Sequence, residues 1–340
     1  MTAVGVAIAG NAAGASDCKL AQVAEWPVRL ERNHFVVDGA INGQGIGVML
    51  DTGATRSIIL RSAAVRLGLP RQRSRRDRMF GVGGETDVEA ALIDEFKIGQ
   101  TVRKNWRMLV AGEHDFGDSI AAILGEDFLQ SFDVEFDVAH HAVRLYQPVD
   151  CDRVSLAYWA SADAGDVEID AVDAARAQIV VPVHINGQPM KALLDSGAST
   201  SVVSKADAAR LGVTPETPGV IAVGSSKGLG AKPVDSWVGP FQSFTIGIET
   251  IKNTEIRFAD LFKDAKYSVA GSHLPTKVQG LPSMLLGADF LRSHRVMIAH
   301  SQRKMYFTYA GGQVFQRNMP PAQGNVPRLE GSAKPDTGQN

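Results

Sequence analysis

Only two cysteines, Cys18 and Cys151, occur among the 340 residues. A structural zinc site needs four Cys or His ligands, and no C-x-x-C or H-x-x-x-H spacing is present, so we expect neither a metal centre nor another cofactor. The 35 basic residues nearly balance the 37 acidic ones. Nucleic-acid binders usually carry a basic excess, so nucleic acid is not expected as a partner. No run approaches 18 consecutive apolar residues, and no membrane span is therefore expected.

Long stretches with the 3.6-residue period of a helix are also scarce. Short apolar runs separated by Gly, Asn-Gly and Pro dominate, which predicts a mainly β protein. The residues at 1–17 are mostly small and apolar. They are similar to the second half of an export signal, although the basic segment that usually precedes it is missing. This favours a periplasmic or secreted protein, and the alternative is a plain disordered terminus.

The sequence contains a long internal repeat. Ile-Asn-Gly-Gln at 41–44 recurs at 185–188, and Leu-Asp-Thr-Gly-Ala at 50–54 recurs as Leu-Asp-Ser-Gly-Ala at 194–198. The offset is constant (195 − 51 = 144). Leu-Gly-x-Asp-Phe-Leu at 124–129 recurs at 286–291, at the larger offset of 286 − 124 = 162. The second copy therefore carries an insertion, which we place in the Gly-, Ser- and Pro-containing segment 260–282.

A repeat of this length indicates duplicated domains rather than small stacked units. The predicted organisation is a first lobe at 18–150, a linker at 151–166, a second lobe at 167–310 and a disordered tail at 311–340. The tail is rich in Gly, Pro, Gln and Asn and lacks apolar periodicity.

One aspartate in each copy, Asp51 and Asp195, follows an apolar strand and precedes a tight turn. Two similar lobes would bring the two carboxyls side by side around a pseudo-twofold axis. Close like charges do not both ionise readily, so such a pair shares one proton. The ionised member can then take a proton from water while the protonated member donates to a substrate carbonyl. We interpret Asp51 and Asp195 as a catalytic dyad.

The residues after each aspartate suit this role. The glycine permits a sharp turn that brings a backbone N–H near the carboxylate, and the hydroxyl can bond to backbone across the lobe interface. The residues after the two glycines, Ala54 and Ala198, have no hydroxyl that could donate to the carboxylates. We therefore expect the pKa values of the two aspartates to be less depressed than in relatives with a hydroxyl there, and activity at mildly acidic to near-neutral pH. The predicted loop-support residues are Thr52, Gly53, Ala54, Ser196, Gly197 and Ala198.

With these motifs the chain resembles the retropepsin-like aspartic proteases, in a two-lobed single-chain form. The resemblance extends from about residue 28 to residue 309. It implies two β-barrel lobes with a cleft between them, an aspartic endopeptidase acting on extended polypeptide, and a monomer that forms an intramolecular pseudo-dimer. It also implies that an apolar-apolar-Gly segment packs against each active-site loop. These segments are Ile123, Leu124 and Gly125, and Leu285, Leu286 and Gly287.

The same resemblance implies flaps over the cleft. In lobe 1 the Gly-rich turn gives Gly81, Val82, Gly83 and Gly84. In lobe 2 the segment 223–232 does not align residue for residue, and we take Val223 and Gly224 as its candidates. Because the ends of a lobe meet in this fold, an exported protein would also allow a disulfide between Cys18 and Cys151. The alternative is two free thiols.

Other readings of the sequence compete with this one. Asp-Thr-Gly recurs at 336–338 with no apolar strand before it, so the tripeptide alone carries little weight. Gly-Ser-Ser-Lys-Gly at 224–228 fits the G-x-S-x-G pattern of serine hydrolases. That pattern requires a following helix, and two glycines and a proline within 228–233 disfavour one. A different class of function also stays open, namely a catalytically silent peptide-binding module that uses the same cleft.

Overall fold

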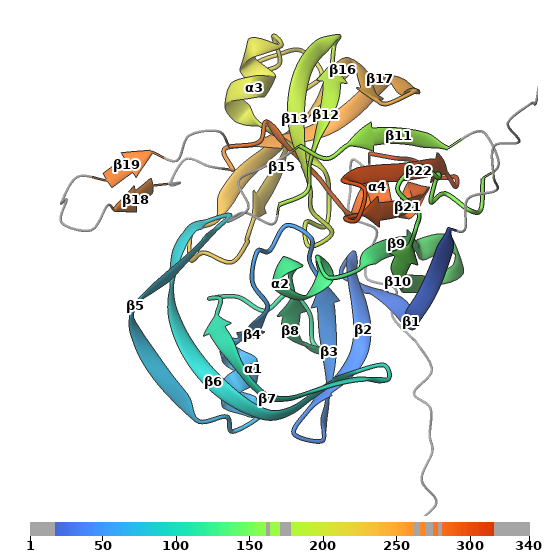
Figure 1. Ribbon diagram of the computed structural model, residues 1–340. Helices are drawn as coiled ribbons and strands as arrows, with labels where there is room; N and C mark the ends of the chain where they lie inside the picture. Colours follow the sequence, from blue (N-terminus) through green and yellow to red (C-terminus); the bar gives the residue numbers. More distant parts are fainter. Residues whose placement is uncertain are drawn as a thin grey trace, which may run out of the picture.

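The computed structural model shows two β-rich lobes joined by a shared sheet (Figure 1). The all-β fold class expected from the sequence is confirmed. The described residues are 18–160, 164–170, 178–261, 266–268, 275–277 and 281–315. The signal-like residues 1–17 lie outside these ranges. In the part of the chain described, no helix is long and apolar enough to cross a membrane.

Lobe 1 is a partly closed barrel whose strands follow the order β2-β3-β8-β4-β7-β6-β5, with β2 also pairing β6. An Asn42-Gly43 turn with positive φ at both residues joins β2 to β3, as tight hairpins require. The elements are β1 (Lys19–Glu31), β2 (His34–Ile41), β3 (Gln44–Leu50), β4 (Ile58–Leu60), α1 (Arg61–Arg66), β5 (Arg71–Gly81), β6 (Gly84–Ile98), β7 (Thr101–Ala111), β8 (Ile120–Leu124), α2 (Glu126–Leu129), β9 (Asp133–Asp137), the 3-10 helix η1 (Val138–His140) and β10 (Ala142–Val149).

Lobe 2 repeats this plan with the order β12-β13-β20-β14-β17-β16-β15 and the closing pair β12–β16. Asn186-Gly187 makes the equivalent positive-φ turn. The elements are β11 (Gly165–Glu168), β12 (Val180–Ile185), β13 (Gln188–Leu194), β14 (Val202–Ser204), α3 (Lys205–Arg210), β15 (Ile221–Ser226), β16 (Val234–Ile246), β17 (Glu249–Ala259), β18 (Lys266–Ser268), β19 (Pro275–Lys277), β20 (Met284–Leu286), α4 (Ala288–Ser293), β21 (His294–Ala299) and β22 (Lys304–Tyr309).

The shared sheet has the order β11-β22-β21-β9-β10-β1, so each lobe supplies one half of it. The halves meet where β9 pairs antiparallel with β21, with Phe136 opposite Val296 and Val134 opposite Ile298. All four of these side chains are buried. Apolar side chains at the junction thus join the two lobes into one core.

In each lobe a parallel pair of strands fixes the loop that carries the aspartate. β3 pairs with β8, and β13 pairs with β20, so that Leu50 lies opposite Leu124 and Leu194 opposite Leu286. The strand ends are entirely buried because they run through the middle of each barrel. A loop that leaves such a strand starts from a rigid point, which is what a precisely placed carboxylate needs.

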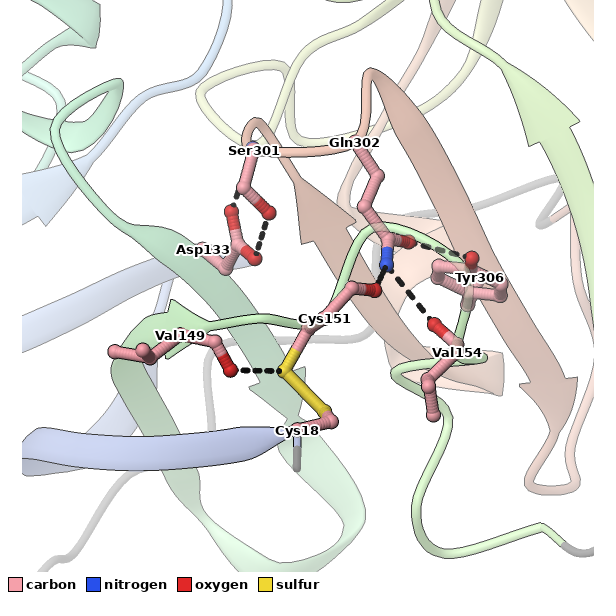
Figure 2. The surroundings of a disulfide bond; sticks show 8 residues. All are labelled: Cys18, Asp133, Val149, Cys151, Val154, Ser301, Gln302 and Tyr306. Atoms are coloured by element: carbon pink, nitrogen blue, oxygen red, sulfur yellow. Dashed lines mark hydrogen bonds between the residues drawn. A yellow bond between two sulfur atoms is a disulfide. The ribbon is translucent and has the colours of Figure 1, made fainter. Parts of the chain in front are cut away.

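The predicted linker, 151–166, is packed against the shared sheet for much of its described length. Leu156 and Ala157 are buried in an apolar cluster with Tyr306, and β11 already begins at Gly165. Gln302 anchors the segment by donating to the carbonyls of Cys151 and Val154 (Figure 2). The sequence failed to show this because Leu156 and Ala157 are too few to give a periodic pattern.

The predicted disordered tail begins too early at 311. Val314 and Phe315 are buried, and the Phe315 ring packs edge-on against Phe244 with 5.0 Å between the centroids. Residues 316–340, including the third Asp-Thr-Gly, lie outside the described ranges. The predicted insertion contains the antiparallel pair β18–β19, which projects from lobe 2 (Figure 1).

Candidate active site

Asp51 and Asp195 meet where the two lobes face each other. Their carboxyls are hydrogen-bonded to one another. The Oδ1 of Asp51 accepts hydrogen bonds from the backbone N–H of Gly53 at 2.9 Å and of Ala54 at 3.0 Å. The Oδ1 of Asp195 accepts one from the N–H of Ala198 at 2.9 Å. Each loop thus holds its own carboxylate by backbone donors, as the turn sequence suggested.

Thr52 and Ser196 lock the two loops together. The N–H of each residue donates to the hydroxyl of the other, at 3.0 Å in both directions. Each hydroxyl in turn donates at 2.8 Å to a strand carbonyl of the opposite lobe, Leu194 for Thr52 and Leu50 for Ser196. Both side chains are fully buried, so these bonds do not compete with water. The lock fixes the position of one aspartate relative to the other.

The two glycines are required by the close approach of the lobes. A Cβ atom on Gly53 would collide with the carboxyl of Asp195, and one on Gly197 would collide with the carboxyl of Asp51. Each glycine therefore packs directly against the aspartate side chain of the opposite lobe. Any larger residue would force the two carboxyls apart.

The predicted loop-packing segments lie directly behind the aspartate loops. Asp51 N–H donates to the Leu124 carbonyl at 3.0 Å, and Asp195 N–H donates to the Leu286 carbonyl at 2.9 Å. Gly125 and Gly287 press against the loop backbone, where an added Cβ would meet the carbonyl oxygens of Ala54 and Ala198. Ile123 and Leu285 both line the cleft.

Four further supporting residues were not assigned a role from the sequence. In lobe 1 the Asp127 carboxylate accepts the N–H of Ser57 at 2.8 Å and its hydroxyl at 2.6 Å. In lobe 2 Asp289 binds Ser201 in the same way, at 2.8 and 2.6 Å. The internal repeat could have identified these residues. Both serines recur at the offset of 144 (201 − 57 = 144), and both aspartates belong to the repeated Leu-Gly-x-Asp motif.

Burial raises the pKa of both dyad carboxyls. For Asp195 the negative charge of Asp51 raises the pKa further, so its pKa lies well above the ordinary value of 3.8. The backbone N–H groups of Gly53 and Ala54 partly offset the effect of burial on Asp51. The pair therefore carries one proton more readily than two isolated aspartates would, and it titrates as a unit.

The cleft above the dyad encloses a cavity of about 290 Å³ with a mainly apolar lining from both lobes. His34 and Gln178 also line it, at equivalent places in the two copies (178 − 34 = 144). His34 packs edge-on against Phe116 at 5.7 Å, and burial lowers its pKa to about 4. A neutral imidazole therefore stands beside the cleft at neutral pH.

Two hairpins cover the cleft, and their tips touch. The β5–β6 turn contains Val82 and Gly83, whose carbonyls accept the N–H groups of Gly230 and Lys232 at 3.0 and 3.1 Å. Gly81 contacts Leu229, and Gly84 contacts Gly230. A Cβ atom added to Gly81 or to Gly230 would collide with these neighbours. Both lobes therefore supply a flap, although the lobe 2 sequence did not align with that of lobe 1.

The lobe 2 flap candidates need correction. Val223 and Gly224 lie within β15, where Gly224 has a φ of +83° in an irregular stretch of the ladder. The residues of this hairpin that line the dyad cavity are Ser226, Lys227, Gly228 and Leu229. The repeat did not reveal these residues because the flap tip lies at different positions in the two copies, so the two segments do not align. Since a β hairpin follows Ser226, the G-x-S-x-G segment also lacks the helix that a serine hydrolase needs.

The remaining candidate residues are the cysteines. Cys18 and Cys151 form a disulfide that joins the start of β1 to the residues just after β10 (Figure 2). No cluster of three or more metal-binding side chains occurs among the residues that the structure describes.

Two β-barrel lobes, a shared sheet and paired Asp-Thr/Ser-Gly loops in mutual contact define a two-lobed acid-protease fold. A family model for aspartyl proteases matches residues 37–128 and 181–290, which is more than half of the chain and includes both aspartate loops. The chain therefore belongs to the aspartyl protease family, in its retropepsin-like form. The comparison with curated proteins finds no match.

Proposed function

We propose that the protein is an aspartic endopeptidase in which Asp51 and Asp195 activate water for attack on a peptide bond. The observation that carries this proposal is the contact between the two carboxyls, each of which packs on the active-site glycine of the opposite lobe. If Asp51 and Asp195 were only turn residues of a duplicated β domain, their carboxyls would have no reason to meet between the lobes. The Thr52–Ser196 lock supports the same conclusion, since it holds the pair rigidly.

The asymmetry of the pair assigns the roles. The Oδ1 of Asp51 accepts hydrogen bonds from two backbone N–H groups, which stabilise its charged form, whereas the Oδ1 of Asp195 accepts one. In the resting dyad Asp51 is therefore the ionised member and Asp195 the protonated one. Asp51 takes a proton from a bound water as that water attacks the carbonyl carbon. Asp195 gives its proton to the carbonyl oxygen, and a tetrahedral gem-diol forms without a covalent enzyme intermediate.

The expected substrate is an extended polypeptide. The cleft runs between the lobes beneath two hairpins, and its apolar lining includes Met49, Ile58 and Phe116 from lobe 1 and Val202 and Leu261 from lobe 2. Such walls favour apolar side chains next to the scissile bond. The contact between the flap tips implies that they separate to admit a chain, because their backbones are hydrogen-bonded across the cleft.

We also propose that the protein acts in the periplasm or outside the cell, as a monomer. The Cys18–Cys151 disulfide supports the first point, since such bonds persist in oxidising compartments. The second point rests on the duplication, because a single chain supplies both aspartates.

The test is incubation with an unfolded protein over a broad pH range, comparing the wild type with Asp51→Asn and Asp195→Asn. We expect cleavage by the wild type and a loss of at least about a thousandfold in both variants, as for other essential catalytic groups. Equal cleavage by all three proteins would exclude the dyad. Peptide binding without cleavage by the wild type would instead identify a catalytically silent peptide-binding module.

A further inference from the structure

A second hollow of about 1020 Å³ adjoins the catalytic cleft on the lobe 1 side. The two cavities share Thr55, Arg56, Met79 and Phe80 in their linings. Thr55 and Arg56 follow directly on the Asp51 loop, and Met79 and Phe80 belong to the ascending strand of the lobe 1 flap. A chain bound over the dyad can therefore continue into this second hollow without leaving the protein surface.

The lining of the second hollow is strongly basic. It contains Arg56 from the active-site loop and three cations from β7, Arg103, Lys104 and Arg107. We call these four residues the basic groove. Among the described residues that line the hollow, Asp127 is the only acidic one. This single carboxylate, whose Oδ1 accepts the N–H and hydroxyl of Ser57, stands against four cations, so the lining keeps an excess of positive charge.

The four cations of the basic groove are exposed. No ion pair joins any of them to a carboxylate within the described ranges, whereas Arg61 and Arg144 of the same lobe do form such pairs. The guanidinium of Arg103 stacks 4.2 Å above the ring of Trp106. That ring is itself buried against Phe96, with 5.2 Å between the centroids, so Arg103 rests on a rigid support.

Lobe 2 lacks this charge at the equivalent positions. Thr200 replaces Arg56 at the offset of 144 (200 − 56 = 144). At the offset of 148 that aligns β7 with β17, Ile251 replaces Arg103, Lys252 retains Lys104 and Glu255 replaces Arg107. The four basic positions of lobe 1 thus become one cation and one anion in lobe 2. The duplication has therefore not kept the basic groove at the aligned positions, and the hollow beside the cleft on the lobe 2 side takes its cations, Lys227 and Arg257, from other positions.

We propose that the basic groove binds acidic side chains of the substrate polypeptide on one side of the scissile bond. This inference rests on the proposed function, because it assigns the groove to the chain that occupies the cleft. Unpaired cations attract carboxylates, and the groove opens directly into the site where a polypeptide must lie. The enzyme would then select substrates that combine an apolar centre with an acidic flank and would set their direction in the cleft.

The test uses four peptides with one apolar central sequence taken from a cleaved protein. One carries three glutamates before the centre, one carries them after it, one has glutamines at all of these positions, and one has lysines. We expect the favoured acidic peptide to exceed the glutamine peptide in kcat/KM by roughly tenfold at low salt, as several exposed charge pairs would give. The preference should shrink as salt screens the charges.

In the triple variant Arg103→Gln/Lys104→Gln/Arg107→Gln we expect this preference to disappear, so that the acidic and glutamine peptides are cut with the same kcat/KM. The variant Arg66→Gln/Lys97→Gln removes two exposed cations outside the groove and should keep the preference. Charge reversal in Arg107→Glu should improve cleavage of the lysine peptide, an outcome that misfolding cannot produce.

The outcomes separate this inference from the proposed function. If no peptide is cut, the proposed function fails. If acidic and glutamine peptides are cut equally well by the wild type, only the role of the basic groove is overturned. The role is also overturned if a single-stranded oligonucleotide inhibits cleavage more strongly than polyglutamate at equal charge, because the groove would then bind nucleic acid.

Discussion

Thr52 and Ser196 exchange hydrogen bonds across the centre of the molecule, and each also bonds to the strand that precedes the other's loop. These two residues are 144 positions apart, so the bonds link the two halves of the duplication at the base of the cleft. The position of Asp51 relative to Asp195 therefore depends on these bonds. The distance between them is set by a lock one residue further along the chain.

Removing the lock should therefore impair activity and stability together. We expect Thr52→Val to lower the free energy of unfolding by about 1–3 kcal/mol, because it leaves the buried N–H of Ser196 without its acceptor. The variant Thr52→Ser retains the hydroxyl and serves as the control. Chemical denaturation and kcat/KM on one peptide measure both effects. A Thr52→Val protein with normal activity would contradict the role of the lock.

The dyad should work at mildly acidic to near-neutral pH. Burial raises the pKa of both carboxyls, and the Asp51 charge raises that of Asp195 further. Activity needs one proton on the pair, so raised pKa values move the whole bell-shaped profile upward. A pH–rate profile measures this directly, and a maximum at strongly acidic pH would refute it. The variant Ala54→Ser adds a hydroxyl donor and should shift the acidic limb down by up to about one pH unit.

Glu126 should make the protein less stable as the pH rises. Its side chain is fully buried behind the Asp51 loop, where burial and the charges of Asp51 and Asp127 raise its pKa to about 9. Neither carboxyl oxygen has a hydrogen-bond partner among the described residues, and the nearest basic atom is the His300 Nε2 at 3.5 Å. Burial lowers the pKa of that histidine to about 4, so it is neutral and offers no compensating charge at neutral pH.

The sign of the effect follows from proton linkage. Between the ordinary pKa of 4.5 and the folded value of about 9, the unfolded chain loses the proton of Glu126 and the folded chain keeps it. Stability from this group is complete below pH 4.5 and falls as the pH rises towards 9. We expect Glu126→Gln to raise the Tm at pH 8 by about 2–4 °C for each kcal/mol recovered, and to have little effect at pH 4. The exposed Glu168→Gln should change neither value.

The disulfide should contribute a large part of the stability of lobe 1. Cys18 and Cys151 enclose a separation of 133 residues, so their bond restricts the unfolded chain strongly. Replacing both cysteines by serine should cost about 2–5 kcal/mol. Thermal unfolding of the wild type with and without reductant gives the same comparison, and a Tm independent of reductant would contradict it. Mass mapping of the unreduced protein identifies the bond itself.

The duplication, the mainly β class and the pairing of Asp51 with Asp195 could all be predicted from the amino-acid sequence. These follow from local information, because a repeated motif with a constant offset and an apolar strand before each aspartate can be read along the chain. Turns such as Asn42-Gly43 are equally local, since few residues tolerate positive φ. The third Asp-Thr-Gly could be set aside for the same reason, as no strand precedes it.

Which residues meet across the two lobes could be learned only from the folded chain. The lobe 2 flap, the packed segment after Cys151 and the buried Phe315 depend on contacts between residues far apart in sequence, and no periodic pattern records them. The basic groove belongs to the same class, because Arg56 and Arg107 come together only when β4 and its loop pack beside β7. Local patterns encode strands and turns, whereas the neighbours of a side chain are fixed only when the chain folds back on itself.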